Sequence, residues 1–325
     1  MSDYVLGIDG GQTSTTAAIC DLAGRLLGVG RAGPANHVWE PGGVPRARRA
    51  VRACVAEAAR EAGIKKAAFR AAFLGITGGE ERTRRALQDS VATQAFRLEN
   101  DKVNALACVT GGGPGVVVIA GTGTITYGEN ARGRSATVSG WGWLLGDEGS
   151  GFWIAREAIQ AATRAWDGRA EPTRLTQALL VAVEATDLWE LHSAVYSEQL
   201  SRAEVAALAA VVPAAAAEGD AVARRVLREA GRELGLAAGT VARQLRLTRG
   251  AVTVGGVGGV FRGSALVRQA FAREVRRHAP RAVFAEPRYA PVMGSVLLAL
   301  RLGGVSIGPA VQENLRAASI RVGAK

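Results

Sequence analysis

The stretch VLGIDGGQTSTTAAICDLAGRLL, residues 5–27, decides the fold, and VVVIAGTGTITYGENARGRSATV, residues 116–138, repeats its pattern. Each stretch reads as an apolar strand, a turn rich in Gly and Thr, a second strand, a polar turn and a third strand. Glycine turns expose backbone N–H groups that no side chain covers, and such groups bind phosphate oxygens. The repeat therefore predicts two related domains that face each other, each presenting a phosphate-binding turn to one ligand.

The composition is that of a globular protein. The chain has 325 residues, which suits two domains, and 48% of them are hydrophobic, which is enough for packed cores. No apolar run reaches the roughly 18 residues of a membrane span, and the N-terminus lacks the basic and then apolar pattern of a signal peptide. We therefore expect a cytoplasmic protein without a membrane partner.

Charge and cysteine spacing exclude further classes. The net charge is +11, but the arginines are scattered over amphipathic helices and no strip of basic and aromatic residues stands out. We therefore do not expect nucleic acid as a partner. Cys20, Cys54 and Cys108 lie far apart and have neither C-x-x-C nor iron–sulfur spacing, so reduced thiols are the simplest interpretation.

Glycine and proline divide the chain into domains. The run GGGPG at 111–115 cannot continue a helix and marks a boundary. We expect an N-terminal domain over 1–114 and a C-terminal domain over 115–290. The last segment, 291–325, is expected to hold a helix at 291–303 that packs back toward the N-terminal domain, followed by a tail with little signal.

Periodicity and turn residues predict the remaining elements. Strands are expected at 4–9, 14–21, 25–31, 70–77, 95–99, 116–120, 250–254 and 282–286. Helices are expected at 46–62, 80–93, after Asn100-Asp101, through most of 149–246 with a capping box at Ser201–Glu204, and at 263–278. Gly231, Gly235 and Gly239 share one helix face, which indicates tight helix packing or, alternatively, the close approach of a flat ligand.

Several motifs carry a family resemblance. GIDGGQTSTTAAICD and IAGTGTITYG resemble the two phosphate motifs of the superfamily of actin, sugar kinases and heat-shock chaperones, and VTVGGVGGVF resembles its adenosine motif. Four blocks are similar to the N-acetylglucosamine kinase branch, which is grouped with the ATPases that activate benzoyl-CoA reductase: ANHVW (35–39), ITGGE (76–80), END (99–101) and SGWGWLLGDEGSGFWIAREAI (139–159). The resemblance runs from about residue 4 to 303 and is weakest at 165–245.

The resemblance implies an α/β fold of two actin-like (ribonuclease H-like) domains. Each is a mixed five-stranded sheet flanked by helices, and the active-site cleft lies between them. The implied enzyme uses ATP and Mg²⁺ to phosphorylate an amino sugar, with the 6-hydroxyl of N-acetylglucosamine as the expected acceptor. Glucosamine, N-acetylmuramic acid or a hexose remain open as substrates, as does a non-kinase ATPase that activates an acyl-CoA dehydratase or reductase. A homodimer is compatible with the family.

Two carboxylates receive the central roles in this resemblance. Asp101 is predicted to be the general base, although an Asn-Asp pair at a helix start is also typical of an N-cap. Asp9 is predicted to hold Mg²⁺ through water, because Mg²⁺ prefers oxygen ligands and retains several waters. The alternative for Asp9 is a carboxylate that caps the turn beside it.

The resemblance also implies the binding residues. The predicted sugar contacts are Asn36, Thr77, Gly78, Asp101, Gly140, Trp141 and Asp147. The predicted nucleotide contacts are Gly10, Gly11, Gln12, Thr13, Thr122, Gly123, Thr124, Gly255 and Gly256, with the Gly231/235/239 face as an opposite wall. Alternatives remain open for three of them: a turn residue for Asn36, a core role for Trp141, and a cap for the helix near 149 for Asp147.

Overall fold

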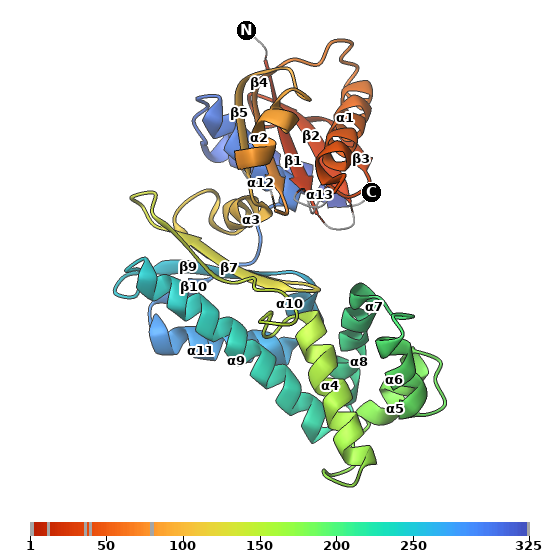
Figure 1. Ribbon diagram of the computed structural model, residues 1–325. Helices are drawn as coiled ribbons and strands as arrows, with labels where there is room; N and C mark the ends of the chain where they lie inside the picture. Colours follow the sequence, from red (N-terminus) through yellow and green to blue (C-terminus); the bar gives the residue numbers. More distant parts are fainter. Residues whose placement is uncertain (1–2, 12–13, 36–37, 39–40, 79–80, 324–325) are drawn as a thin grey trace. The chain divides into compact units, whose positions relative to one another are not determined.

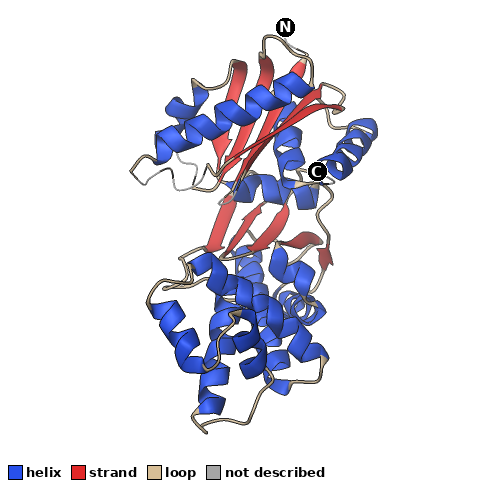
Figure 2. Cartoon of the chain, turned by 90° about the vertical axis from the view of Figure 1, so that its right-hand side faces the viewer, coloured by secondary structure: helices blue, strands red, loops and turns tan. Residues whose placement is uncertain are grey.

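The computed structural model describes residues 3–11, 14–35, 38, 41–78 and 81–323, and the chain forms two compact units. Unit 1 consists of Met1–Gly113 and Glu286–Lys325, and unit 2 consists of Pro114–Ala285. Each unit contains one five-stranded sheet with helices packed on it (Figures 1 and 2). The expected α/β fold with two mixed five-stranded sheets is confirmed.

The sheet of unit 1 combines antiparallel and parallel pairs. Its strands are β1 (Tyr4–Gly10), β2 (Thr15–Asp21), β3 (Leu26–Ala32), β4 (Phe69–Ile76) and β5 (Thr93–Glu99), in the order β3-β2-β1-β4-β5. β1 pairs antiparallel with β2 and parallel with β4, which itself pairs parallel with β5. The carboxyl ends of β1, β4 and β5 therefore lie at one edge, where polar groups of α/β sheets commonly gather.

Helices cover both faces of this sheet. Successive side chains of a strand point to opposite faces, so Leu6 joins the core under α1 (Gly43–Glu61) while Val5 joins the core on the other side. That second core includes residues of α3, α12 and α13, which span Asp101–Thr110, Pro291–Leu302 and Pro309–Gly323. A Cβ on Gly7 would lie 2.5 Å from the backbone nitrogen of Val296, so α12 packs directly against β1.

The sheet of unit 2 repeats this topology. Its strands are β6 (Gly115–Ala120), β7 (Thr124–Glu129), β8 (Ser135–Ser139), β9 (Val252–Val257) and β10 (Ala282–Phe284), in the order β10-β9-β6-β7-β8. β6 pairs antiparallel with β7 and parallel with β9, as β1 does with β2 and β4. The predicted duplication of the strand–turn–strand pattern is therefore present in the strand order.

A long helical segment separates β8 from β9. Its helices are α4 (Gly151–Trp166), α5 (Leu175–Ala182), α6 (Leu188–Tyr196), α7 (Arg202–Ala207), the 3₁₀ turn η1 (Leu208–Ala210), α8 (Val211–Ala217) and α9 (Ala221–Gln244). The predicted capping box between Ser201 and Glu204 is confirmed at the start of α7. After β9 come α10 (Gly259–Gly263) and α11 (Ala265–His278), and α9 packs along α11 (Figure 1).

The glycine face of α9 is covered by protein. A Cβ on Gly231 would lie 2.4 Å from the carbonyl oxygen of Val267 in α11, and one on Gly239 would lie 2.5 Å from His278. The two helices therefore approach too closely for any larger residue at these positions. Tight helix packing is confirmed, and the interpretation of this face as a wall for the nucleotide is wrong.

Some predicted bounds differ from the observed ones. The helix expected at 80–93 ends at Gln88, because β5 already begins at Thr93. The helix expected at 263–278 is confirmed as α11, which begins two residues later because Ser264 caps it by accepting a hydrogen bond from the Val267 N–H. The short helix α10 before it was not predicted. The helix α13 was not predicted, because the last residues offer little periodicity.

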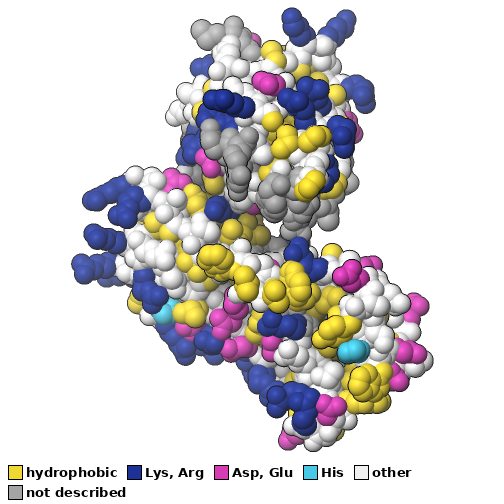
Figure 3. Space-filling model, viewed as in Figure 1, with side chains coloured by type: hydrophobic (Ala, Val, Ile, Leu, Met, Phe, Trp, Pro, Cys, Tyr) yellow, Lys and Arg dark blue, Asp and Glu magenta, His cyan; other side chains and the backbone are white. Residues whose placement is uncertain are grey.

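Two observations concern the surface and the length of the helices. On the face drawn in Figure 3, basic side chains are spread over both units rather than aligned in one strip. Within the described ranges, no helix has both the length and the apolar character required to cross a bilayer.

Candidate functional site

Asp101 stands at the carboxyl edge of the sheet of unit 1. β5 ends at Glu99, and Asn100 caps α3 by accepting a hydrogen bond from the Lys102 N–H at 3.2 Å. Asn100 is thus the N-cap residue, so the capping alternative for Asp101 is not needed to start the helix. The carboxylate of Asp101 lies in the first turn of α3, where the helix dipole favours negative charge.

Thr77 connects this carboxylate to the neighbouring strand. Its hydroxyl donates a hydrogen bond to Oδ2 of Asp101 at 2.6 Å, and its N–H donates to the carbonyl oxygen of Gly10 at 2.8 Å. Gly78, the next predicted sugar contact, has φ of 73° and continues the turn after β4. The ends of β1 and β4 and the start of α3 are therefore tied together.

Asn104 holds the second carboxylate, and the sequence did not identify it. Its side-chain N–H donates to Oδ1 of Asp9 at 2.7 Å, and the residue is 1% exposed. A Cβ on Gly75 would lie 2.4 Å from Oδ1 of Asn104, so this side chain fits only against a glycine. Asn104 follows Asp101 by three residues, and this i, i+3 spacing on a helix was the available signal.

Burial governs the ionisation of both carboxyl groups. Burial raises the pKa of Asp9 to about 6, the hydrogen bond from Asn104 opposes this, and the charge of Asp101 adds to it. Burial also raises the pKa of Asp101, against the hydrogen bond from Thr77. Two desolvated carboxylates without a cation repel each other, and a divalent cation would relieve this cost.

The donor set fits Mg²⁺ only as a partial site. Asp9 offers carboxylate oxygens, which Mg²⁺ prefers, but no group of three or more His, Cys, Asp or Glu side chains gathers within the described part of the chain. Mg²⁺ characteristically keeps several waters and binds through one or two carboxylates plus substrate phosphates. The residues present therefore suit a metal ion that arrives with a nucleotide.

The first phosphate turn follows Asp9. Gly10 belongs to β1, and the N–H of Gly11 donates to the carbonyl oxygen of Ser14 at 2.9 Å, which closes the turn. The predicted contacts Gln12, Thr13 and Asn36 lie outside the described residues, as does His37.

The second phosphate turn, residues 121–124, is held mostly by backbone groups. The carbonyl oxygen of Gly121 accepts from the Gly151 N–H at 2.7 Å, and that of Thr122 accepts from the Phe152 N–H at 3.2 Å. Thr124 donates its hydroxyl to the carbonyl oxygen of Ile119 at 2.8 Å. The hydroxyl of Thr124 therefore shapes the turn, while Thr122 and Gly123 form its tip.

Asp147 lies against this same turn. Its Oδ1 accepts a hydrogen bond from the Thr124 N–H at 3.2 Å, and a Cβ on Gly123 would lie 2.7 Å from its Oδ2. Burial raises its pKa, opposed by the hydrogen bond from Thr124. The capping interpretation is wrong, because Ser150 caps α4 by accepting from the Trp153 N–H at 3.1 Å.

The segment before Asp147 is exposed and apolar. Trp141 is 75% exposed and Leu145 is 76% exposed, so a core role for Trp141 is wrong. Trp143 contacts the ring of Phe152, with a centroid distance of 5.4 Å. Gly140 has φ of 81°, a left-handed conformation that favours glycine.

The two glycines predicted to contact the adenosine, Gly255 and Gly256, lie within β9, whereas Gly258 and Gly259 of the same motif follow the strand. Gly255 pairs with Val117 and Gly256 with Val118 in the parallel ladder with β6. A Cβ on Gly256 would lie 2.5 Å from the ring of Phe261, so this glycine makes room for Phe261. Their contact with a nucleotide remains a prediction.

A pocket that the sequence did not predict opens beside the second phosphate turn. Its volume is about 460 Å³, and its lining combines Gly121 and Thr122 with residues of α4, α7, η1, α8, α9, α10 and α11. Pockets of roughly 300–1,000 Å³ are typical of small-molecule sites. The pocket lies within unit 2 and is reached directly from the tip of the turn.

Duplicated mixed sheets that carry glycine turns and buried carboxylates define an actin-like ATPase fold. A model of the BadF/BadG/BcrA/BcrD ATPase family matches residues 6–299. The chain belongs to this family, so the resemblance read from its motifs is confirmed.

Known proteins with similar chains include several sugar kinases. An N-acetylmuramic acid/N-acetylglucosamine kinase of Clostridium acetobutylicum is 30% identical over 302 residues, 91% of this chain and 98% of that protein. An N-acetyl-D-glucosamine kinase of Dictyostelium discoideum is 28% identical over 313 residues, 92% of this chain and 98% of that protein. The crystal structure of a candidate N-acetylglucosamine kinase of Chromobacterium violaceum has a TM-score of 0.72 at 28% identity, covering 92% of this chain and 99% of that chain.

Proposed function

We propose that this protein transfers the terminal phosphoryl group of ATP to an amino sugar, with the 6-hydroxyl of N-acetylglucosamine as the acceptor. The observation that carries the proposal is that two carboxylates lie at the carboxyl edge of the sheet of unit 1: Asp9, which accepts a hydrogen bond from Asn104, and Asp101, which accepts one from Thr77. Phosphoryl transfer needs a metal-neutralised phosphate and a base for the acceptor hydroxyl, and the two carboxylates suit these two tasks.

Asp101 is the proposed general base. Its raised pKa makes it a stronger base than an ordinary carboxylate, and the hydrogen bond from Thr77 orients its carboxylate. The base takes the proton of the sugar hydroxyl as that oxygen attacks the phosphorus. The positions of Asn36, Thr77, Gly78, Gly140, Trp141 and Asp147 are the proposed sugar contacts.

Asp9 is the proposed anchor for Mg²⁺, which it would hold through water. Asn104 orients the Asp9 carboxylate by its hydrogen bond. The ion would neutralise charge on the phosphates. Thr122 and Gly123, at the tip of the second turn, are the proposed partners of the phosphates, together with the positions of Gly10 to Thr13. Gly255 and Gly256 remain proposed contacts of the adenosine.

A sugar panel tests this proposal. Purified protein with ATP and Mg²⁺ is incubated with N-acetylglucosamine, glucosamine, N-acetylmuramic acid and glucose, and sugar phosphate is detected by mass spectrometry. We expect N-acetylglucosamine to give the highest kcat/KM and the phosphate to be on the 6-oxygen by NMR. If no sugar of this panel is phosphorylated, the proposal is wrong.

The alternative function, activation of an acyl-CoA dehydratase or reductase, has less support. Such activators bind an iron–sulfur cluster through cysteine thiolates. The three cysteines of this chain, Cys20, Cys54 and Cys108, are buried free thiols, and burial raises the pKa of each. A buried neutral thiol is a poor metal ligand, so the amino-sugar kinase is the better-supported function.

A further inference from the structure

The pocket beside the second phosphate turn bears on which nucleotide the protein uses, and this inference rests on the proposed function. We propose that the pocket receives the nucleoside of the phosphate donor and recognises the purine by shape alone. The protein would therefore also use GTP and ITP as donors, with kcat/KM values within about 100-fold of the value for ATP. The pocket begins at Gly121 and Thr122, so a nucleotide whose phosphates lie on this turn would extend its base into it.

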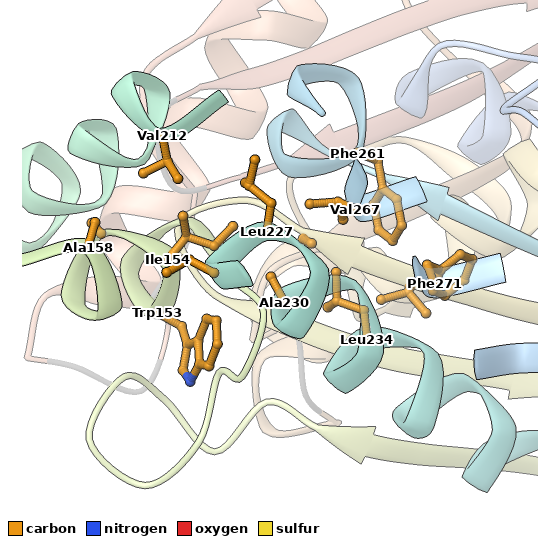
Figure 4. Close-up of a cluster of buried hydrophobic side chains, with 14 of the residues drawn as sticks. Trp153, Ile154, Ala158, Val212, Leu227, Ala230, Leu234, Phe261, Val267 and Phe271 are labelled. Carbon is orange, nitrogen blue, oxygen red and sulfur yellow. The ribbon is translucent and has the colours of Figure 1, made fainter. Parts of the chain in front are cut away.

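The side chains that line the pocket are almost all apolar. One wall consists of small residues of α7, η1 and α8, namely Ala203, Ala206, Ala207, Ala209, Ala210 and Pro213. Ile154, Leu227 and Val267 come from α4, α9 and α11, and Figure 4 shows these three side chains directed toward one another. Of all lining residues, only Thr122 and Ser264 carry a polar atom in the side chain.

The backbone of the wall offers few free partners. Ala206 to Ala210 lie in consecutive helical turns, where N–H and carbonyl groups bond to each other. The carbonyl oxygens of Gly121 and Thr122 already accept hydrogen bonds from the first turn of α4. The edge of the base therefore faces methyl groups on this wall rather than donors and acceptors.

Ser264 does not distinguish one purine base from another either. Its Oγ accepts from the Val267 N–H, and a hydroxyl can both donate and accept. It can therefore pair with the amino group of adenine or with the carbonyl oxygen of guanine or hypoxanthine.

The energetic consequence is weak selection among purines. A pocket built to hydrogen-bond its ligand rejects the wrong analogue by about 10⁴–10⁵-fold, whereas an apolar pocket rejects a polar isostere by about 10²-fold at most. Adenine, guanine and hypoxanthine share one ring shape and differ only in edge groups. A pyrimidine is smaller and covers less of the apolar wall, so CTP should be a poorer donor than any purine nucleotide.

A donor panel tests the inference. Values of kcat/KM are measured for ATP, GTP, ITP and CTP at saturating amino sugar, with sugar phosphate detected by mass spectrometry. We expect the kcat/KM values for GTP and ITP to lie within about 100-fold of the value for ATP. A preference for ATP over GTP larger than this overturns the inference.

Direct binding separates this inference from the proposed function. Calorimetry without sugar gives dissociation constants for MgADP and MgGDP, and we expect their ratio to lie within the same limit. If no sugar is phosphorylated with any donor, the proposed function fails, yet this ratio still decides the inference. A selective affinity for MgADP beyond that limit overturns it.

A matched pair of variants tests the location. Ala207 is exposed and lines the pocket, so Ala207→Phe should fill it and weaken MgADP and MgGDP binding alike, by about 10-fold or more. Ala214 is exposed on α8 but does not line the pocket, so Ala214→Phe should bind nucleotides as the unmodified protein does. Unchanged nucleotide affinity in Ala207→Phe, with the fold intact by circular dichroism, would place the base elsewhere.

Discussion

Unit 1 and unit 2 share one strand order but hold their polar groups in different ways. In unit 1, side chains hold side chains: Asn104 binds Asp9 and Thr77 binds Asp101. In unit 2, the phosphate turn is held mainly by backbone N–H groups of α4, with one side-chain contact from Asp147, and the nearby pocket is lined mainly by glycines and apolar side chains. The site of unit 1 therefore depends on a few side chains, whereas that of unit 2 depends on how closely its helices pack.

The largest effect should come from the proposed base. Asp101→Asn keeps the shape but removes the proton acceptor, so kcat should fall by about 10²–10⁴-fold while nucleotide and sugar affinities stay near normal. Steady-state kinetics and calorimetry measure the two quantities. Glu99→Gln, which changes the acid two residues earlier, is the control and should retain activity. Near-normal turnover of Asp101→Asn would leave the carboxylate with only a structural role.

A smaller loss is expected one helical turn further along. Asn104→Ala leaves Asp9 without its hydrogen bond, and loss of such outer partners typically costs about 10–100-fold in metal affinity or activity. Titration of the rate with Mg²⁺ should therefore show a higher Mg²⁺ requirement. Asn314→Ala removes a comparable hydrogen bond, to the carbonyl oxygen of Ala23, and should leave the Mg²⁺ requirement unchanged. If the two variants have the same Mg²⁺ requirement, Asn104 does not support metal binding.

A shift in pH dependence should follow from Thr77→Val. The hydrogen bond from Thr77 lowers the pKa of Asp101, so its removal raises that pKa. Because the base must be ionised, the acid limb of the kcat/KM profile should move to higher pH, with a rate near optimum reduced by about 10-fold or less. Thr77→Ser retains the hydroxyl and should keep the original limb. An unmoved limb in Thr77→Val would mean that Asp101 does not control the profile.

The smallest catalytic effect is expected in the helices of unit 2. Gly231→Ala places a methyl group 2.4 Å from the carbonyl oxygen of Val267, so α9 and α11 must separate, at a cost of about 1–3 kcal/mol in the free energy of unfolding. Denaturant unfolding measures this cost, while kcat should change little. Arg228→Ala, at an exposed position of α9, should leave stability unchanged. A full-stability Gly231→Ala protein would contradict the close packing of the two helices.

Much of the fold could be predicted because short sequence patterns determine its strands, turns and helix starts. Alternating apolar residues at 5–27 and 116–138 identified the paired strands, and Asn100 and Ser201 were identified as helix starts. The predicted ends of some helices, such as the C-terminal end of α2, were less accurate, because the end of a helix depends on where the next strand can pair.

Less of the candidate site could be predicted. Motifs pointed to Asp9, Asp101 and Asp147, but not to Asn104, whose importance depends on the approach of α3 to β1 across 95 residues of sequence. The pocket of unit 2 was missed because its wall is made of alanines, which carry no chemical signal. The glycines of α9 were ambiguous, since sequence spacing cannot tell a ligand from a neighbouring helix.

The sequence by itself determined the duplicated sheets, the two glycine-rich turns and the candidate carboxylates Asp9, Asp101 and Asp147, because strand alternation and short motifs are properties of short segments. The tertiary structure alone decided which side chains hold those carboxylates, which helix covers the glycine face of α9 and where the pocket opens. Those outcomes depend on contacts between segments far apart in the chain, and close packing selects them only once the sheets and helices have assembled.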